Sequence, residues 1–172
     1  MNRRLMKVKY KAGKGVYVEY EVFHNELWDS HTMRSNDVPE TEFLDALQAL
    51  ATDVADLCEL CPECATGIVV QGVSLSYGGE DGVMGATITA LRTLDSANSP
   101  LVLNTPHKPE SADDKDKTPV LSCECVDHID LLEIATWRYV DGNRAQLTFA
   151  FGMGQDEEAV SDKDMAYDKV MP

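Results

Sequence analysis

The sequence predicts an α+β domain in which two main helices pack on a mostly antiparallel sheet of about five or six strands. Segments typical of strands occur in pairs joined by glycine-containing turns, and two amphipathic helical segments interrupt or follow these pairs. The length of 172 residues suits one domain. We expect this domain to span residues 1–152, with a mobile loop near residues 105–120 and an acidic, disordered tail at residues 153–172.

The strongest strand signal is a hairpin in the middle of the chain. Gly67–Tyr77 and Val83–Leu94 are rich in Val, Ile, Thr and Leu, and the loop between them contains glycines that can take positive φ. Pairing Tyr77 with Val83 places the bulk on one face and small side chains, including Ser74 and Ser76, on the other. The small face suits either the chain's own helices or a shallow ligand groove.

Four further segments have the composition of strands. They are Leu5–Tyr10, Gly15–Phe23, Leu101–Leu103 and Ala145–Phe151. The stretch His24–His31 is polar and lacks alternation, so it is predicted as a connection.

The first helix is expected to begin after Asp37, a capping residue with Glu40 three positions later, and to run to about Glu59. Its apolar residues recur at three- and four-residue steps: Phe43, Leu44, Leu47, Leu50, Ala51, Val54, Leu57 and Cys58. The second helix is expected from Ser122 to about Val140. Its apolar line contains Cys125, Ile129, Leu132, Thr136 and Tyr139, broadened by Leu131, Ile134, Ala135 and Trp137.

The charge is strongly negative and unevenly distributed. The net charge is −15, and Gly15–Leu91 contains fourteen acidic residues and a single base, Arg34, whereas six bases lie in the first fourteen residues. This balance argues against direct binding of nucleic acid. We also expect no membrane span and no secretory signal, because no long apolar run is present, and hence a cytoplasmic protein.

The acids of the first helix lie off its apolar stripe and have no basic neighbour on that helix. We therefore expect a negative surface that attracts a basic protein partner. The predicted partner-binding residues are Glu40, Glu42, Asp45, Asp53 and Asp56.

The five cysteines cannot all pair with one another. A zinc site can be drawn from Cys61, Cys64, Cys123 and Cys125, because two closely spaced cysteine pairs can hold one tetrahedral ion. Buried free thiols behave as small hydrophobic groups and explain the same residues. We expect free thiols, and neither a metal nor a cofactor.

Catalytic motifs such as G-x-S-x-G, the P-loop and H-E-x-x-H are absent from the sequence, so we do not expect an enzyme. An alternative function remains open. A small-molecule or metal-binding site can be drawn on the central hairpin and the loop that follows it, from Ser74, Ser76, Asn104 and His107.

Three phrases resemble segments of small acidic accessory proteins of tailed bacteriophages and prophages. They are GVSLSYGGEDGVMGATITAL at Gly72–Leu91, SANSPLVLNTPHKP at Ser96–Pro109 and the turn at Val140–Gln146. Some proteins of that group inhibit host defence, including Cas9-type nucleases, by occupying basic surfaces that bind nucleic acid. The resemblance implies a non-catalytic inhibitor or accessory factor that acts in the cytoplasm of a bacterial host on a basic host or phage protein. A homo-oligomer is compatible with this expectation.

Overall fold

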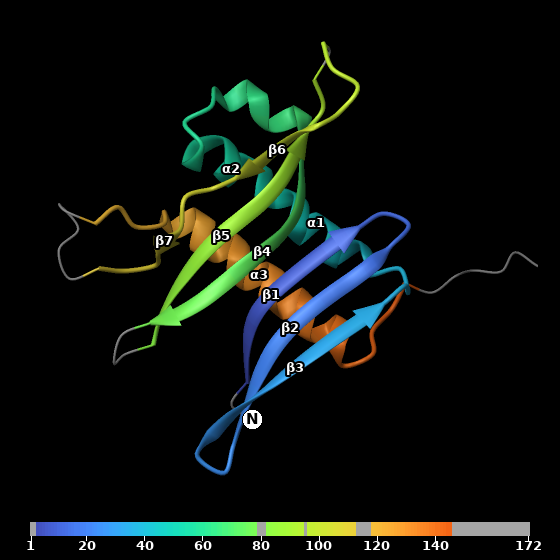
Figure 1. Ribbon diagram of the computed structural model, residues 1–172, viewed down its shortest axis with the longest axis vertical. Helices are drawn as coiled ribbons and strands as arrows, with labels where there is room; N and C mark the ends of the chain where they lie inside the picture. Colours follow the sequence, from blue (N-terminus) through green and yellow to red (C-terminus); the bar gives the residue numbers. More distant parts are fainter. Residues whose placement is uncertain (1–2, 79–81, 95, 113–117, 146–172) are drawn as a thin grey trace, which may run out of the picture.

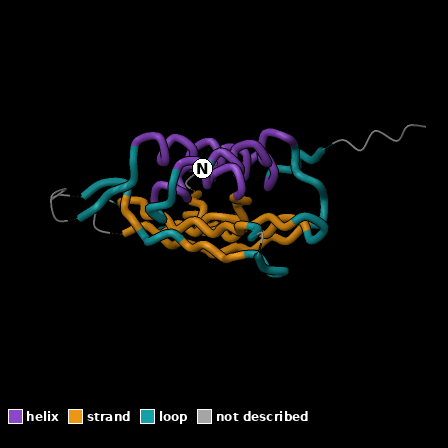
Figure 2. The backbone as a smooth tube through the Cα atoms, turned by 90° about the horizontal axis from the view of Figure 1, so that it is seen from above, coloured by secondary structure: helices purple, strands orange, loops and turns teal. Residues whose placement is uncertain are grey.

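The computed structural model describes residues 3–78, 82–94, 96–112 and 118–145. Within these residues, seven strands form one antiparallel sheet, and the helices cover one of its faces. Figure 2 shows the two layers edge on. The predicted α+β class is confirmed. The other face of the sheet, turned away from the helices, is called the open face below.

The strands form two groups along the chain. The first group is β1 (Arg3–Lys11), β2 (Gly15–His24) and β3 (Leu27–Ser35). The second is β4 (Ile68–Gly78), β5 (Val83–Arg92), β6 (Leu101–Asn104) and β7 (Lys108–Pro109). In space the order is β3-β2-β1-β4-β5-β6, and β7 pairs with β5 (Figure 1). The groups therefore join where β1 pairs with β4, in the middle of the sheet.

The helices are α1 (Thr41–Ala49), α2 (Ala51–Leu57), the short 3-10 helix η1 (Pro62–Gly67) and α3 (Cys123–Val140). The expected first helix is thus divided at Leu50, and it begins four residues after Asp37. Asp37 does not cap it, because its carboxylate accepts hydrogen bonds from Ser35 and Arg144. The second helix matches its prediction: the Ser122 hydroxyl accepts the hydrogen bond of the Cys125 amide at 3.1 Å.

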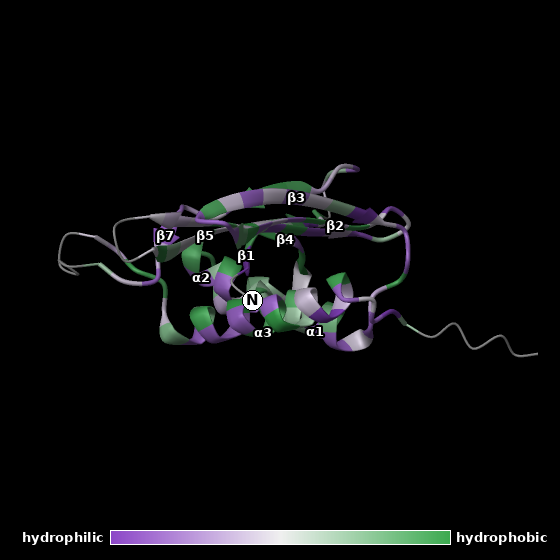
Figure 3. Cartoon of the chain, turned by 90° about the horizontal axis from the view of Figure 1, so that it is seen from below, coloured by the Kyte–Doolittle hydropathy of each residue, from purple (hydrophilic) through white to green (hydrophobic). Residues whose placement is uncertain are grey.

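The core lies between the two layers and contains both predicted helical stripes. Phe43, Leu47 and Val54 of the first stripe are buried, and so are all five residues of the predicted line on α3. Each large apolar side chain buried in this way contributes about 1.5–3 kcal/mol. Figure 3 shows the three helices together beneath the sheet, with hydrophobic and hydrophilic residues alternating along them. The helix layer therefore has one face committed to packing and one available to solvent.

The central hairpin forms, and its predicted register is correct at Val69 and Leu91 but wrong by one residue from Gly72 to Gly78. Tyr77 pairs with Met84 rather than with Val83, and Gln71 is an extra residue that bulges between Val70 and Gly72. The bulge reverses the alternation along β4. The buried side chains of the hairpin are Ile68, Val70, Val73, Leu75, Met84, Ala86, Ile88 and Ala90. On β5 the predicted small face consists of Met84, Ala86, Ile88 and Ala90, and all four are buried. This half of the small face therefore packs against the chain's own helices, which is one of the two interpretations given above.

Ser74 and Ser76 were assigned to that same face and lie instead on the open face, because the bulge precedes them. Between the bulge and these serines, Gly72 allows β1 and β4 to approach closely. A Cβ atom there would lie 2.2 Å from the carbonyl oxygen of Val8, so a larger residue would force the strands apart.

Strand β3 was not predicted. It pairs with β2 along its whole length through a two-residue turn, in which Asn25 and Glu26 have φ values of 49° and 66°. Most of its side chains are exposed, so it shows no alternation of apolar and polar residues. An edge strand of this kind is held by its backbone hydrogen bonds rather than by a buried face.

The loop expected to be mobile near residues 105–120 is partly fixed to the sheet. The hydroxyl of the buried Thr105 accepts a hydrogen bond from the Ile88 amide at 2.9 Å, and β7 then pairs with β5. Residues 113–117 of this loop, most of the predicted strand Ala145–Phe151 and the predicted tail at residues 153–172 lie outside the described residues.

The two strand groups have the same strand order outward from the central β1–β4 pair. Val8 faces Val73 in the antiparallel β1–β4 pair, and each strand has a bulged residue two positions earlier, Met6 in β1 and Gln71 in β4. The helices that follow each group contact the other group in addition to their own, as Phe43 of α1 packs on Tyr10 of β1. Helices α1 and α2 contact β4, whereas Trp137 of α3 contacts Tyr20 of β2. The halves are therefore interlocked.

Candidate functional site

The two layers carry opposite charge. The helices α1, α2, η1 and α3, all within the described ranges, contain nine acidic residues and one basic residue, Arg138. The described strands contain eight Lys and Arg residues and three acids. The net charge of −15 therefore conceals an acidic helix layer beside a basic sheet.

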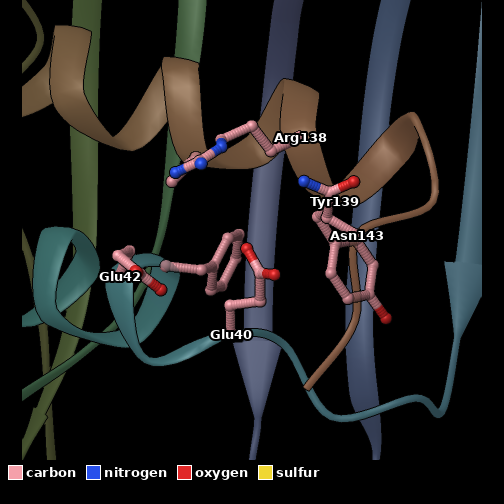
Figure 4. Close-up of a pocket in the computed structure, with 7 residues that line it drawn as sticks. Glu40, Glu42, Arg138, Tyr139 and Asn143 are labelled. Carbon is pink, nitrogen blue, oxygen red and sulfur yellow. The ribbon is translucent and has the colours of Figure 1, made fainter. Parts of the chain in front are cut away.

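Four of the five predicted partner-binding acids reach the surface of the helix layer. Glu42, Asp45 and Asp56 are exposed, and Glu40 is half-buried. Figure 4 shows Glu40 and Glu42 on one side of a crevice and Arg138 of α3 on the other. The crevice has a volume of about 10 Å³, which is enough for one water molecule at most. This part of the surface therefore offers charge for docking rather than a ligand pocket.

The prediction that Asp53 faces solvent is wrong. Its relative exposure is 7%, and its carboxylate lies 2.7 Å from Nδ1 of His128 on α3. Burial raises the pKa of Asp53, although the hydrogen bond and charge of His128 act in the opposite direction. Asp53 thus joins α2 to α3 inside the helix layer and is unavailable to a partner.

Helix α3 adds residues to this surface that were not predicted as site residues. Leu131 and Ile134, expected to broaden the buried stripe, are 55% and 58% exposed. Asp127 and Asp130 are exposed on the same helix. Two exposed apolar side chains among acids resemble the centre and rim of a protein-binding surface. Leu131 and Ile134 are three residues apart, and the same spacing occurs in the buried stripe. The sequence therefore did not indicate that these two side chains face solvent.

The four cysteines of the predicted zinc site come from two elements, η1 and α3. Within the described ranges, no three His, Cys, Asp or Glu side chains lie close enough together to hold a metal ion. Cys61 and Cys64 lie at the start of η1, whereas Cys123 and Cys125 lie in the first turn of α3. Burial, followed by the nearby Asp53, raises the pKa of Cys125 to about 12, so its thiol stays protonated at neutral pH. A protonated thiol is a poor metal ligand and a poor nucleophile.

The residues of the alternative ligand site lie on or beside the open face. His107 Nε2 is 2.8 Å from the Ser76 hydroxyl, and its ring covers Gly85. Asn104 accepts a hydrogen bond from Thr89 at 2.9 Å. Ser74 is in register with Lys7 of β1. The structure thus brings the four residues to one side of the molecule, where they offer hydrogen-bonding groups.

Comparisons of the chain with protein-family models, with curated proteins and with solved structures find no match. In the part of the chain that the structure describes, none of the helices combines the length and the apolar character needed to cross a bilayer.

Proposed function

We propose that this chain is a non-catalytic binding protein that docks the outer surface of its helix layer on a basic surface of another protein. We call this docking surface the acidic helix surface. It consists of the exposed residues Glu42, Asp45, Asp56, Asp127, Asp130, Leu131 and Ile134. The observation that carries the proposal is the presence of two exposed apolar side chains, Leu131 and Ile134, within a helix layer that has nine acids and one base.

The two kinds of residue have different roles in such docking. Exposed carboxylates steer a basic partner toward the surface and reject acidic ones, and they act mainly on the association rate. Apolar side chains supply affinity once they are desolvated at the centre of an interface. A surface with carboxylates alone would bind weakly and with little selectivity.

The negative charge of the acidic helix surface also indicates which class of protein would bind to it. A basic surface large enough to cover two helices is typical of proteins that handle nucleic acid. The resemblance to phage accessory proteins agrees with this partner class, and it suggests a phage-encoded inhibitor or accessory factor directed at such a protein, for example a nuclease of host defence.

The test is charge reversal at three exposed positions. The variant with Glu42→Lys, Asp45→Lys and Asp56→Lys should keep its thermal melt and lose binding to the partner, measured by calorimetry after the partner is isolated by affinity capture. Binding of the unchanged protein should weaken as salt rises, because exposed charges are screened beyond roughly 10 Å at 0.1 M salt.

A matched control reverses three exposed acids outside the helix layer, Glu26, Asp29 and Glu110. It has the same net charge and should bind normally. A second variant, with Leu131→Ser and Ile134→Ser, keeps the charge of the surface and should associate at a similar rate and dissociate faster. Equal loss of binding in the control and the test variant would show that total charge, rather than the acidic helix surface, governs association.

A further inference from the structure

The open face contains a large hollow that the proposed function does not use. Its volume is about 800 Å³, within the range of pockets that bind small ligands. Five basic side chains line it: Lys7, Lys9, Lys11, Lys14 and Arg34. Carboxylates are missing from its lining as far as the described residues go.

The strand register explains how these side chains come together. Lys7, Lys9 and Lys11 alternate along β1, so all three project from the same face. Arg34 of β3 is opposite Tyr17 of β2, which is opposite Lys9. The row continues through Gly72, Thr89 and Asn104. One continuous line thus crosses six described strands, with basic residues in its first half and neutral hydrogen-bonding groups in its second.

The backbone produces the depression. Gly72 occupies the middle of this row and has no side chain to fill it. The adjacent bulge bends β4 and brings Gln71 into the lining. The lining of the hollow therefore combines residues of the first three strands with Gln71 of β4 and with Thr89 and Leu91 of β5.

Within the described parts of the chain, few acids compensate the positive charge of the hollow. Among the described residues, no carboxylate lies within 4 Å of the amino groups of Lys9, Lys11 and Lys14 or the guanidinium of Arg34. The nearest acid by register is Glu19, which accepts a hydrogen bond from Tyr17 and lies 3.8 Å from Lys7. The charge of the hollow is local, and the acids of the helix layer lie on the opposite side of the sheet.

We infer that this hollow binds a short stretch of single-stranded nucleic acid. The lysines of β1 form a line of positive charge for a phosphate backbone. The guanidinium of Arg34 lies 5.0 Å from the ring centre of Tyr17, and these two flat groups provide a stacking surface for a base. Gln71, Thr89 and Asn36 offer amide and hydroxyl groups to base edges. A duplex would stay outside, because a hollow of this volume accepts only a few nucleotides.

This inference revises the expectation drawn from the whole-chain charge. Charges further apart than about 10 Å are screened at 0.1 M salt, so the local field of the hollow decides binding there. The remaining acids still weaken the interaction, and we expect a dissociation constant on the order of 10⁻⁵ M at low salt.

The test uses the full chain and a short fluorescein-labelled oligothymidylate, with binding measured by fluorescence anisotropy. The slope of log affinity against log salt should reach up to about −3.5 if all five cations contact phosphates. The variant with Lys9→Glu and Lys11→Glu should lose at least about tenfold in affinity and give a shallower slope. The control variant, with Arg92→Glu and Lys108→Glu, has the same charge change outside the lining of the hollow and should bind like the unchanged protein.

Competition experiments distinguish a site for single-stranded nucleic acid from other kinds of anion-binding site. Unlabelled oligothymidylate should displace the probe, and a duplex of equal length should displace it poorly. Displacement by poly-L-glutamate at the same charge concentration would overturn the inference in favour of a site for acidic polypeptides. Absence of binding at low salt, or equal loss in the two charge variants, would also overturn it. Reversal of Glu42, Asp45 and Asp56 should leave oligonucleotide binding intact, so the two proposals fail independently.

Discussion

At the scale of single residues, Asp53 and Asp56 show how position decides the role of a side chain. The two residues are three positions apart on α2, yet Asp56 is exposed and Asp53 is buried against His128. An isolated buried carboxylate would cost several kcal/mol, and the hydrogen bond with His128 offsets part of that cost. Asp53 is therefore a structural link between α2 and α3.

The raised pKa of Asp53 predicts a definite pH dependence. Glu124 and Cys125 also face its carboxylate, and burial is the largest cause of the shift. The folded protein holds the proton of Asp53 at pH values where the unfolded chain, with a pKa of about 3.9, has released it. This contribution to stability is complete below the unfolded pKa and is lost as pH rises through the folded pKa. Relative to Asp53→Asn, the unchanged protein should lose melting temperature as the pH rises from the unfolded pKa of about 3.9 through the raised folded pKa of Asp53.

The measurement is a series of thermal melts of the two proteins across that range. Asp56→Asn, which removes the same charge from the exposed side of α2, is the control for the change in net charge. A difference between the unchanged protein and Asp53→Asn that stays constant with pH would show that Asp53 ionises as freely in the folded as in the unfolded state.

At the scale of elements, the sequence was most informative where one face is buried. The stripe on α3 was predicted residue by residue, because Cys125, Ile129 and Leu132 follow the helical period and no bulge interrupts a helix. Strand β3 was missed because its side chains are exposed, so burial leaves no pattern in them. The hairpin register was missed because one bulged residue, Gln71, shifts every later residue of β4.

The candidate site was less predictable than the fold, for related reasons. Asp53 and His128 are 75 positions apart in the sequence. No local pattern around either residue predicts that the two side chains are in contact. The basic hollow combines side chains from β1, β2 and β3, and β3 was not expected to be a strand. Its lysines are visible in the sequence, but their common face depends on the pairing of strands.

The buried stripe of the first helix predicts strong effects of charged substitutions. Leu47→Asp and Val54→Asp should each unfold the domain, because an unpaired carboxylate at these buried positions costs several kcal/mol. Thermal unfolding followed by circular dichroism measures this directly. Leu131→Asp makes the same chemical change on the exposed side of α3 and should leave the melt nearly unchanged. A Leu47→Asp variant as stable as Leu131→Asp would mean that α1 does not pack on the sheet.

At the scale of the whole molecule, the separation of charge has a geometric basis. All described helices lie on one face of the sheet, so their exposed residues form one surface and the open face of the sheet forms another. Acids are concentrated in helix sequences and bases in strand sequences. A one-sided fold converts this difference in composition into two charged surfaces on opposite sides.

The interlocking of the halves predicts that their order along the chain can be exchanged. Arg3 at the start of β1 pairs with Asp141 after α3 at 2.8 Å, so the two ends of the described chain lie close together. Cys61 and Pro62, between the two halves, are both exposed. A circular permutant that begins at Pro62, continues from Pro172 into Met1 and ends at Cys61 should therefore fold. It keeps the β1–β4 pair and both helix contacts, and it interrupts the turn in which the Cys64 amide donates a hydrogen bond to the Cys61 carbonyl oxygen at 2.9 Å. Its far-ultraviolet circular dichroism should match that of the unchanged chain, and its melt should remain cooperative. An unfolded permutant would show that the connection from α2 to β4, rather than the packing between the halves, holds the sheet together.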